Sequence, residues 1–288
     1  MKRLALGLIV LAVAGGCAAQ RPAGPSFGDD LAFLKQHTNV IVLSDAAGQV
    51  QVAVSPALQG RVMTSTTGGL AGPSFGWINR DLMASGKKLE HFNPVGGEER
   101  FWLGPEGGQF SIYFAKGAAF DLEHWFVPAA IDTEPFDVVS TTRDAARFAR
   151  RIRLTNYSGT AFDVAVDRHI RLLAPEAAWK ALGIDPPAGV QVAAFESVNR
   201  ITNAGTEAWK KETGLLSIWI LSMFNPSPAT TVVAPIQAGT EAERGQPVVD
   251  DYFGKVPAER LIVKDKVVFF SADGTCRSKI GFGPKRTT

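Results

Sequence analysis

The sequence predicts an all-β protein with few short helices, and three observations lead to this prediction. Short runs of β-branched and aromatic residues recur along the chain, turn residues separate many of these runs, and two pairs of runs have the spacing of hairpins. Recurrent short strands with turns between them are typical of a β-sandwich or barrel. We therefore expect one β-rich domain over residues 29–288.

The expected elements follow the chain in order. Asp29 and Asp30 precede an apolar pattern that ends before Asn39, which predicts a short capped helix. A turn with Gly48 and a turn at 156–160 each join two strands into a hairpin. Strands are expected at 40–44, 49–54, 60–66, 110–114, 148–154, 161–173, within 190–202, and at 215–224, 232–235, 261–263 and 267–270.

The N-terminus predicts export. Lys2 and Arg3 precede an apolar run at 4–13 and small residues at 14–16, as in a secretory signal. The run is too short to span a bilayer, which needs about 20 apolar residues. Residues 18–28 are rich in Ala, Pro and Gly and predict a flexible tether to the folded domain.

Cys17, directly after the small residues, resembles the cysteine of a bacterial lipobox, which is diacylated and becomes the new N-terminus. Ala14 departs from that pattern, because a large aliphatic residue is preferred there. The resemblance implies a lipid anchor at Cys17 and, with Ala18 following it, the outer membrane facing the periplasm. An ordinary secretory signal with an incidental cysteine remains the alternative.

The charge and cysteine content of the chain set aside two properties, nucleic-acid binding and an intramolecular disulfide. The 30 basic and 28 acidic residues nearly balance, so no nucleic-acid partner is expected. The alternating arginines at 147–153 are interpreted as the solvated face of a strand. Cys276 is the only cysteine besides Cys17, which excludes an intramolecular disulfide in the mature chain. The runs at 269–274 and 278–284 resemble the middle of a sheet, so the reading frame is expected either to be truncated or to end in a docked edge strand.

The densest polar and aromatic segment is 93–111, which predicts a saccharide site. Its five glycines allow close approach of the backbone, and Trp102 offers an apolar plate for a sugar ring. The hydrogen-bonding groups expected there belong to Glu98, Glu99, Arg100, Glu106 and Gln109. The alternative is a glycine-rich crossover whose arginine and carboxylates pair with one another.

A second candidate is His169. Alternation along the strand places it on the same face as Asp167, with Arg168 on the other face, and a nearby carboxylate favours a charged imidazole. The alternative is a surface ion pair. Glu196 and Asn199 near a strand end are further ligand candidates. Trp209 and Trp219 add aromatic surface, although buried aromatic side chains in a sandwich core are the commoner explanation for such residues. No metal-binding or nucleotide-binding motif is present, so no metal and no cofactor are expected.

Five motifs resemble the galactose mutarotase-like β-supersandwich. Three point to that fold: Gly-Arg-Val at 60–62, Gly-Gly-Glu-Glu-Arg-Phe-Trp-Leu-Gly-Pro-Glu at 96–106, and Thr-Asn-Tyr-Ser-Gly at 155–159. Two more, Glu-Ser-Val-Asn-Arg-Ile-Thr-Asn at 196–203 and Gly-Leu-Leu-Ser-Ile-Trp-Ile-Leu at 214–221, resemble an exported bacterial group, the DUF6786 type. The resemblance covers most of 38–283.

The resemblance implies sugar chemistry. Aldose epimerases of that superfamily use a glutamate base and a histidine acid, which here would be Glu106 (or Glu98) and His169. The Asn-His-x-Tyr-Phe-Asn motif of those epimerases has no match in this sequence. Their glutamate base lies on a strand late in the chain, a region that a truncated reading frame would lack. We therefore expect a carbohydrate-binding lipoprotein without assured catalysis, with an epimerase-like enzyme as the alternative and a glycosidase as a third option. The expected ligand contacts are Glu98, Arg100, Trp102, Gln109, Arg168, Glu196 and Asn199.

Overall fold

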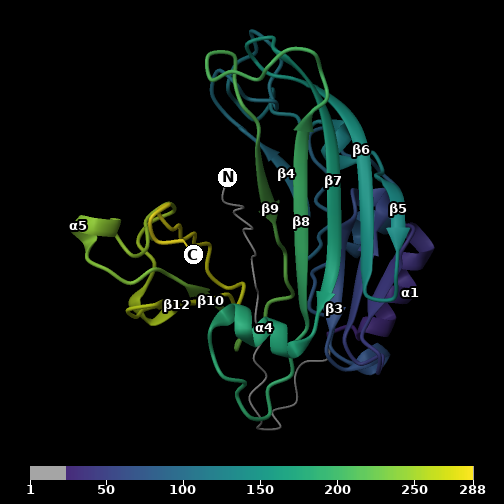
Figure 1. Cartoon of the computed structure of the whole chain (residues 1–288), viewed down its shortest axis with the longest axis vertical. Coiled ribbons are helices and arrows are strands. Elements are labelled where there is room, and N and C mark those ends of the chain that lie inside the picture. Colours follow the sequence, from purple (N-terminus) through teal and green to yellow (C-terminus); the bar gives the residue numbers. More distant parts are fainter. Residues whose placement is uncertain (1–23, 288) are drawn as a thin grey trace. The chain divides into compact units, whose positions relative to one another are not determined.

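The computed structural model describes residues 24–287 and is mainly β-sheet (Figure 1). Strands account for 33% of the residues and helices for 16%, and the strands form four antiparallel sheets. This confirms the predicted β-rich fold with short helices. The signal segment, the lipobox with Cys17 and most of the predicted tether lie outside the described residues.

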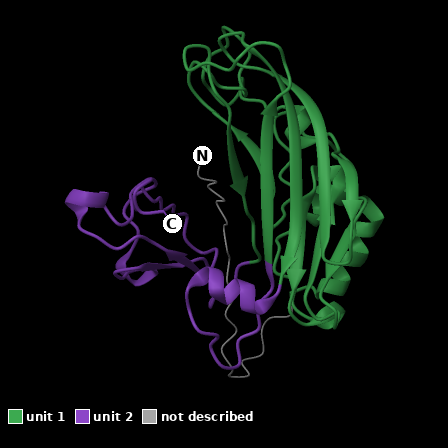
Figure 2. Ribbon diagram, in the orientation of Figure 1, with its two compact units in different colours: residues 1–7, 19–173, 195–225 green, residues 8–18, 174–194, 226–288 purple. Residues whose placement is uncertain are grey.

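The chain divides into two compact units, coloured separately in Figure 2. Within the described residues, unit 1 comprises 24–173 and Phe195–Asn225. Unit 2 comprises Ala174–Ala194 and 226–287. Each unit is described by itself.

The strands of unit 1 form three sheets. The first has the order β1-β2-β3, the second pairs β4 with β9, and the third has the order β5-β6-β7-β8. The strands are β1 Ile41–Ser44, β2 Gln51–Ser55, β3 Arg61–Thr66, β4 Arg100–Gly104, β5 Asp137–Thr141, β6 Ala145–Thr155, β7 Ala161–Leu173, β8 Ala194–Asn203 and β9 Ser217–Leu221. The short helices are α1 Phe27–His37, η1 Pro56–Leu58, η2 Gly69–Ala71, α2 Arg80–Ser85 and α3 Ala129–Asp132.

Helix α1 begins earlier than the sequence predicts. Ser26 is its N-cap, and its side chain accepts a hydrogen bond from the backbone of Asp29, whose carboxylate in turn accepts from Ser26. Phe27 is completely buried, and its backbone N–H donates to the carbonyl of Gly72. The predicted tether therefore overlaps the fold at Ser26–Gly28, because the capping box and the buried Phe27 fix those residues.

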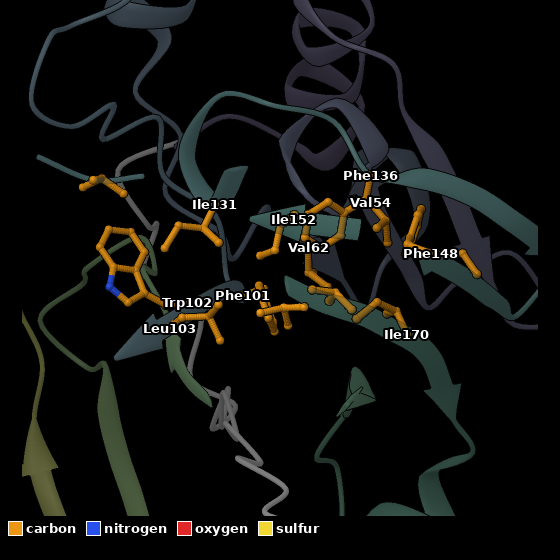
Figure 3. Close-up of a cluster of buried hydrophobic side chains, with 14 of the residues drawn as sticks. Val54, Val62, Phe101, Trp102, Leu103, Ile131, Phe136, Phe148, Ile152 and Ile170 are labelled. Atoms are coloured by element: carbon orange, nitrogen blue, oxygen red, sulfur yellow. The ribbon is translucent and has the colours of Figure 1, made fainter. Parts of the chain in front are cut away.

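The sheet β1-β2-β3 is covered on both faces. Ala53 and Met63 pack with the apolar side of α1. Val52, Val54 and Val62 face the main core, where they meet side chains of the third sheet (Figure 3). Because successive residues of a strand point to opposite faces, one strand can serve both clusters.

The longest strands, β6 and β7, pair over their whole length and have one buried face. Phe148 on β6 and Val164 and Ile170 on β7 are fully or almost fully buried in the main core. The side chains between them point away from the core, including those of Arg147 and His169. The predicted hairpin is confirmed. The solvated face is confirmed for Arg147, Arg151 and Arg153 but not for Arg150, which lies on the same side of β6 as Phe148 and Ile152.

Residues 110–114 do not form the predicted strand. Ile112 and Tyr113 are buried, but the segment consists of bends. The Tyr113 hydroxyl donates to the Leu103 carbonyl at 2.6 Å, and the Ser111 hydroxyl donates to the Glu106 carbonyl at 2.7 Å. Side-chain packing and these hydrogen bonds hold the segment in place instead of a sheet ladder. The other predicted strands occur close to their expected positions.

Unit 2 contains a small three-stranded sheet of order β10-β12-β11. Its elements are α4 Pro175–Leu182, β10 Thr231–Pro235, α5 Glu241–Arg244, η3 Ala258–Arg260, β11 Leu261–Val263 and β12 Val267–Ser271. The buried Arg286 donates to the carbonyls of Gln237, Gly239, Thr240 and Gly245. These bonds tie the segment 237–245 to the segment that carries Arg286.

Candidate functional site

The glycine-rich segment that the sequence singles out is mostly buried. Its residues 100–104 form β4, all five of which are buried. Glu98, Arg100 and Trp102 are each only 2% exposed. The prediction that Trp102 offers an open apolar surface to a sugar ring is therefore wrong, because neighbouring side chains cover the tryptophan ring.

Glu99 and Arg168 form a buried ion pair at the centre of unit 1. Arg168 Nη1 donates to Asn199 Oδ1 at 2.6 Å, and the Ser197 hydroxyl donates to Glu99 Oε1 at 3.0 Å. Burying a charge is costly unless it is paired and hydrogen-bonded, and this network satisfies both groups. Arg168 and Asn199 therefore position each other and Glu99 in the described structure.

Arg100 pairs with a different partner. Its Nη2 donates to Asp132 Oδ1 at 2.8 Å, while its guanidinium lies 4.1 Å from the ring centroid of Trp102 and 4.9 Å from that of Phe92. Cation–π contacts of this kind stabilise an arginine away from water. Burial lowers the pKa of Arg100 to about 10 despite the nearby Asp132.

Glu98 faces yet another neighbour. Its Oε1 accepts hydrogen bonds from the backbone N–H of Ser65 at 2.6 Å and from the Ser65 hydroxyl at 2.9 Å. Burial raises the pKa of Glu98 to about 7, and the Ser65 bonds oppose that rise. Within 98–100, then, each charged residue bonds to a distant segment, and the interpretation that they pair with one another is wrong.

An exposed tryptophan lies directly across from Trp102. Trp102 on β4 pairs in register with Trp219 on β9, and their ring centroids are 5.5 Å apart. Trp219 is 36% exposed, whereas Trp102 is stacked against Tyr113 on another side. Trp219 is therefore the aromatic ring that this strand pair presents to solvent.

Polar groups gather beside Trp219 where β4 ends. A Cβ placed on Gly104 would lie 2.9 Å from Ser217 Oγ, 3.8 Å from Trp219 Cδ1 and 4.0 Å from the backbone nitrogen of Glu106. A side chain at position 104 would therefore clash with Ser217 Oγ, and only glycine lets Ser217 lie against the backbone here. Glu106 is exposed, and its Oε1 accepts from Trp102 Nε1 at 3.0 Å. We call Trp219, Ser217 and Glu106 around Gly104 the Trp219 platform.

A separate depression lies on the outer face of the third sheet. It has a volume of about 330 Å³ and is lined by Ser140, Arg147, Asp167, His169, Val198 and Arg200. Arg147 donates to Asp167 through both Nε and Nη2 at 2.8 Å, which lowers the pKa of the Asp167 carboxyl. This confirms that Asp167 and His169 share a face. We call this feature the outer-face depression.

The structure does not bring Glu106 and His169 together. His169 lines the outer-face depression, whereas Glu106 lies outside it and bonds to Trp102. Arg168 and His169 are on opposite faces of β7, as the alternation predicts. A base and an acid that share one sugar must both reach it, and this geometry does not assemble that pair.

The remaining predicted ligand residues, Glu196 and Gln109, make the following contacts. Glu196 pairs with Arg171 at 2.5 Å. Gln109 is exposed, and its backbone carbonyl accepts from the Ser158 hydroxyl at 2.6 Å. Sequence reasoning missed Ser217 and Arg200, and it favoured a core position for Trp219, which the structure instead exposes to solvent. The apolar run at 215–224 contains the tryptophan but carries no alternation that would reveal its exposed face.

Residues 24–287 hold neither a metal-ion cluster nor a membrane-spanning helix. In 24–287 no cluster of three or more His, Cys, Asp or Glu side chains is arranged to hold a metal ion. Nor does any helix in that range have the length and apolar character required to cross a membrane.

Comparison with known proteins identifies a family but no activity. The model of the family described as "Family of unknown function (DUF6786)" matches residues 25–288, so the chain belongs to that family. No curated protein and no solved structure matches the chain.

Proposed function

We propose that this member of the DUF6786 family is an envelope-anchored lipoprotein that binds a saccharide at the Trp219 platform. One observation carries the proposal: an exposed tryptophan ring lies beside a glycine, a hydroxyl and an exposed carboxylate. A sugar ring has an apolar face that stacks on an aromatic ring and hydroxyls that need donors and acceptors. Trp219 offers the first, and Ser217 and Glu106 offer the second.

The platform is held in place by the buried side chains behind it. Trp102 supports Trp219 and is itself fixed between Arg100 and Tyr113. Glu106 is oriented by its bond to Trp102 Nε1, and its Oε2 makes no hydrogen bond to any described residue. Rigid support of this kind lowers the entropy lost when a ligand binds.

Calorimetry with the full chain and a panel of mono- and oligosaccharides tests this function. Trp219→Ala is expected to weaken binding by at least about tenfold, since stacking on an aromatic ring is worth roughly 1.5 kcal/mol. Trp219→Phe is expected to retain part of the affinity. Glu106→Gln is expected to lower the affinity more than Trp219→Phe does. Leu215→Ala, another exposed apolar residue nearby in the sequence, is the matched control.

Either of two results would contradict the proposal. One is that no saccharide binds to protein with a native near-UV circular dichroism spectrum. The other is that binding is equally strong in Trp219→Ala and in wild type.

Binding without catalysis is preferred over the epimerase-like alternative. The Glu106 and His169 side chains lie in separate features, so neither completes the acid–base pair for the other. We also propose the galactose mutarotase-like supersandwich as the fold, supported by the antiparallel sheets and the motif resemblance. Polarimetry checks the activity: interconversion of sugar anomers faster than buffer, lost in His169→Asn, would restore the enzymatic alternative.

The membrane anchor is proposed from Cys17 and the apolar run before it. Labelling growing cells with radioactive palmitate is expected to mark the wild-type protein and not Cys17→Ser. Equal labelling of both, or none of either, would leave an ordinary secretory signal as the explanation.

A further inference from the structure

Along three of its four strands, the outer face of the third sheet carries more positive than negative side chains. On β6, β7 and β8 this face holds five arginines and three carboxylates, an excess of two positive charges. The arginines are Arg147, Arg151, Arg153, Arg171 and Arg200, and the carboxylates are Asp163, Asp167 and Glu196. Because the whole chain has a formal net charge of only +2, this is a local feature and not a general basic character.

Each carboxylate on this face already has an arginine. Arg147 holds Asp167 through two bonds of 2.8 Å. Arg171 lies 2.5 Å from Glu196, and Arg153 lies 4.0 Å from Asp163. The two remaining arginines are Arg151 and Arg200, of which Arg151 donates to the Ala204 carbonyl at 3.1 Å.

Of the two arginines on this face whose guanidinium makes no hydrogen bond within the described residues, Arg153 and Arg200, only Arg200 lines the outer-face depression. Its Nη1 is 3.7 Å from Asp167 Oδ2, beyond hydrogen-bond distance, and its side chain is 66% exposed. Within the described part of the chain, its guanidinium makes no hydrogen bond. The carboxylate it approaches is already engaged by Arg147, so Arg200 keeps the two-pronged donor geometry that matches a carboxylate.

Arg200 lines the outer-face depression together with other side chains that donate hydrogen bonds. Ser140 is directly opposite Arg147, and Arg147 is directly opposite His169, so one row crosses three strands. Val198 and Arg200 on β8 complete the lining of the outer-face depression. Its volume of about 330 Å³ lies at the small end of ligand pockets.

We infer that the outer-face depression binds the carboxylate of an acidic saccharide, with Arg200 as its main contact and Arg147 as an arginine held in position by Asp167. This inference rests on the proposed function for the ligand being a saccharide. The ligand is thus a uronate-containing chain and not a neutral sugar. Ser140 and His169 supply hydrogen-bonding groups for its hydroxyls.

The test compares two ligands of equal length, an oligogalacturonate and a neutral malto-oligosaccharide, by calorimetry on the full chain. We expect the acidic ligand to bind at least about tenfold more tightly and Arg200→Gln to remove about that factor, as loss of one charged hydrogen-bonded contact does. Arg153→Gln is the matched control, since Arg153 of β6 lies on the same face of the sheet as Arg200, is 74% exposed and lies outside the depression. It is expected to change the affinity less than about twofold.

Each outcome separates this inference from the proposed function. The first outcome is that both ligands bind equally tightly, Trp219→Ala abolishes the binding of both, and Arg200→Gln has no effect. This overturns the acidic-ligand inference and leaves the saccharide function standing. Acidic binding that depends on Arg200 but survives Trp219→Ala supports the depression and overturns the platform. Equal loss in Arg200→Gln and Arg153→Gln, or equal binding of a single-stranded DNA oligonucleotide, shows unspecific attraction and overturns the inference.

Discussion

Ion pairs with carboxylates stabilise most of the buried arginines of unit 1 but not the buried arginine of unit 2. In unit 1, Arg100 and Arg168 pair with carboxylates next to an extensive apolar core, whereas Arg61 donates to the Gly96 carbonyl and to Gln59 Oε1. In unit 2, Arg286 is equally buried but bonds to backbone carbonyls of one loop. Both apolar clusters found among the described residues belong to unit 1.

This difference shows which interactions the stability of each unit depends on. A carboxylate left alone in an apolar interior is very unfavourable, so unit 1 depends on keeping both members of each pair. A carbonyl that loses a donor costs much less, particularly near the surface.

The largest effect is expected from breaking the central ion pair of unit 1. Arg168→Met leaves Glu99 buried without its partner and is expected to lower the free energy of unfolding by about 3–5 kcal/mol. Urea unfolding followed by tryptophan fluorescence measures this. The control is Arg171→Met on the same strand, where the pair with Glu196 is exposed, and a loss of less than about 1 kcal/mol is expected. Equal losses in both variants would contradict the importance of burial.

An intermediate, pH-dependent effect is expected at Glu98. Its pKa in the folded protein, about 7, lies above the ordinary 4.5, so folding favours the protonated carboxyl. The stabilisation is complete below pH 4.5 and is lost as the pH rises from 4.5 to 7, by at most about 3 kcal/mol.

Glu98→Gln is expected to remove that fall in stability, which urea unfolding at a series of pH values would show. Glu196→Gln, which changes a partly exposed carboxylate on β8, serves as the control and should retain the fall in stability that Glu98 causes. If wild type and Glu98→Gln have parallel profiles across this range, the buried carboxyl does not titrate there.

The smallest effect is expected from Arg286→Ala and should be confined to unit 2. Losing a charged donor to several carbonyls is expected to cost about 2 kcal/mol locally. Hydrogen exchange measured peptide by peptide should accelerate in 237–245 and remain unchanged in 145–173. Acceleration in both segments would show that the two units unfold together.

Much of the fold could be predicted from local pattern. Alternation in 148–154 and 161–173 identified the long hairpin and the side chains on each face, because successive strand residues point in opposite directions. Turn residues placed the two predicted hairpins. The helix start and the tether boundary were displaced because Phe27 is fixed by a distant carbonyl, that of Gly72.

The candidate site required the tertiary structure. The sequence by itself determined that 93–111 is rich in charged and aromatic groups and that Asp167 and His169 share a face. It could not show that β4 is buried on both sides, because such a strand has no alternation between apolar and polar positions. The partners of Glu99 and Arg100 lie in remote segments, at Arg168 and Asp132, and only folding brings them together. For the same reason, only the pairing of β4 with β9 decided that Trp219, and not Trp102, is exposed to solvent.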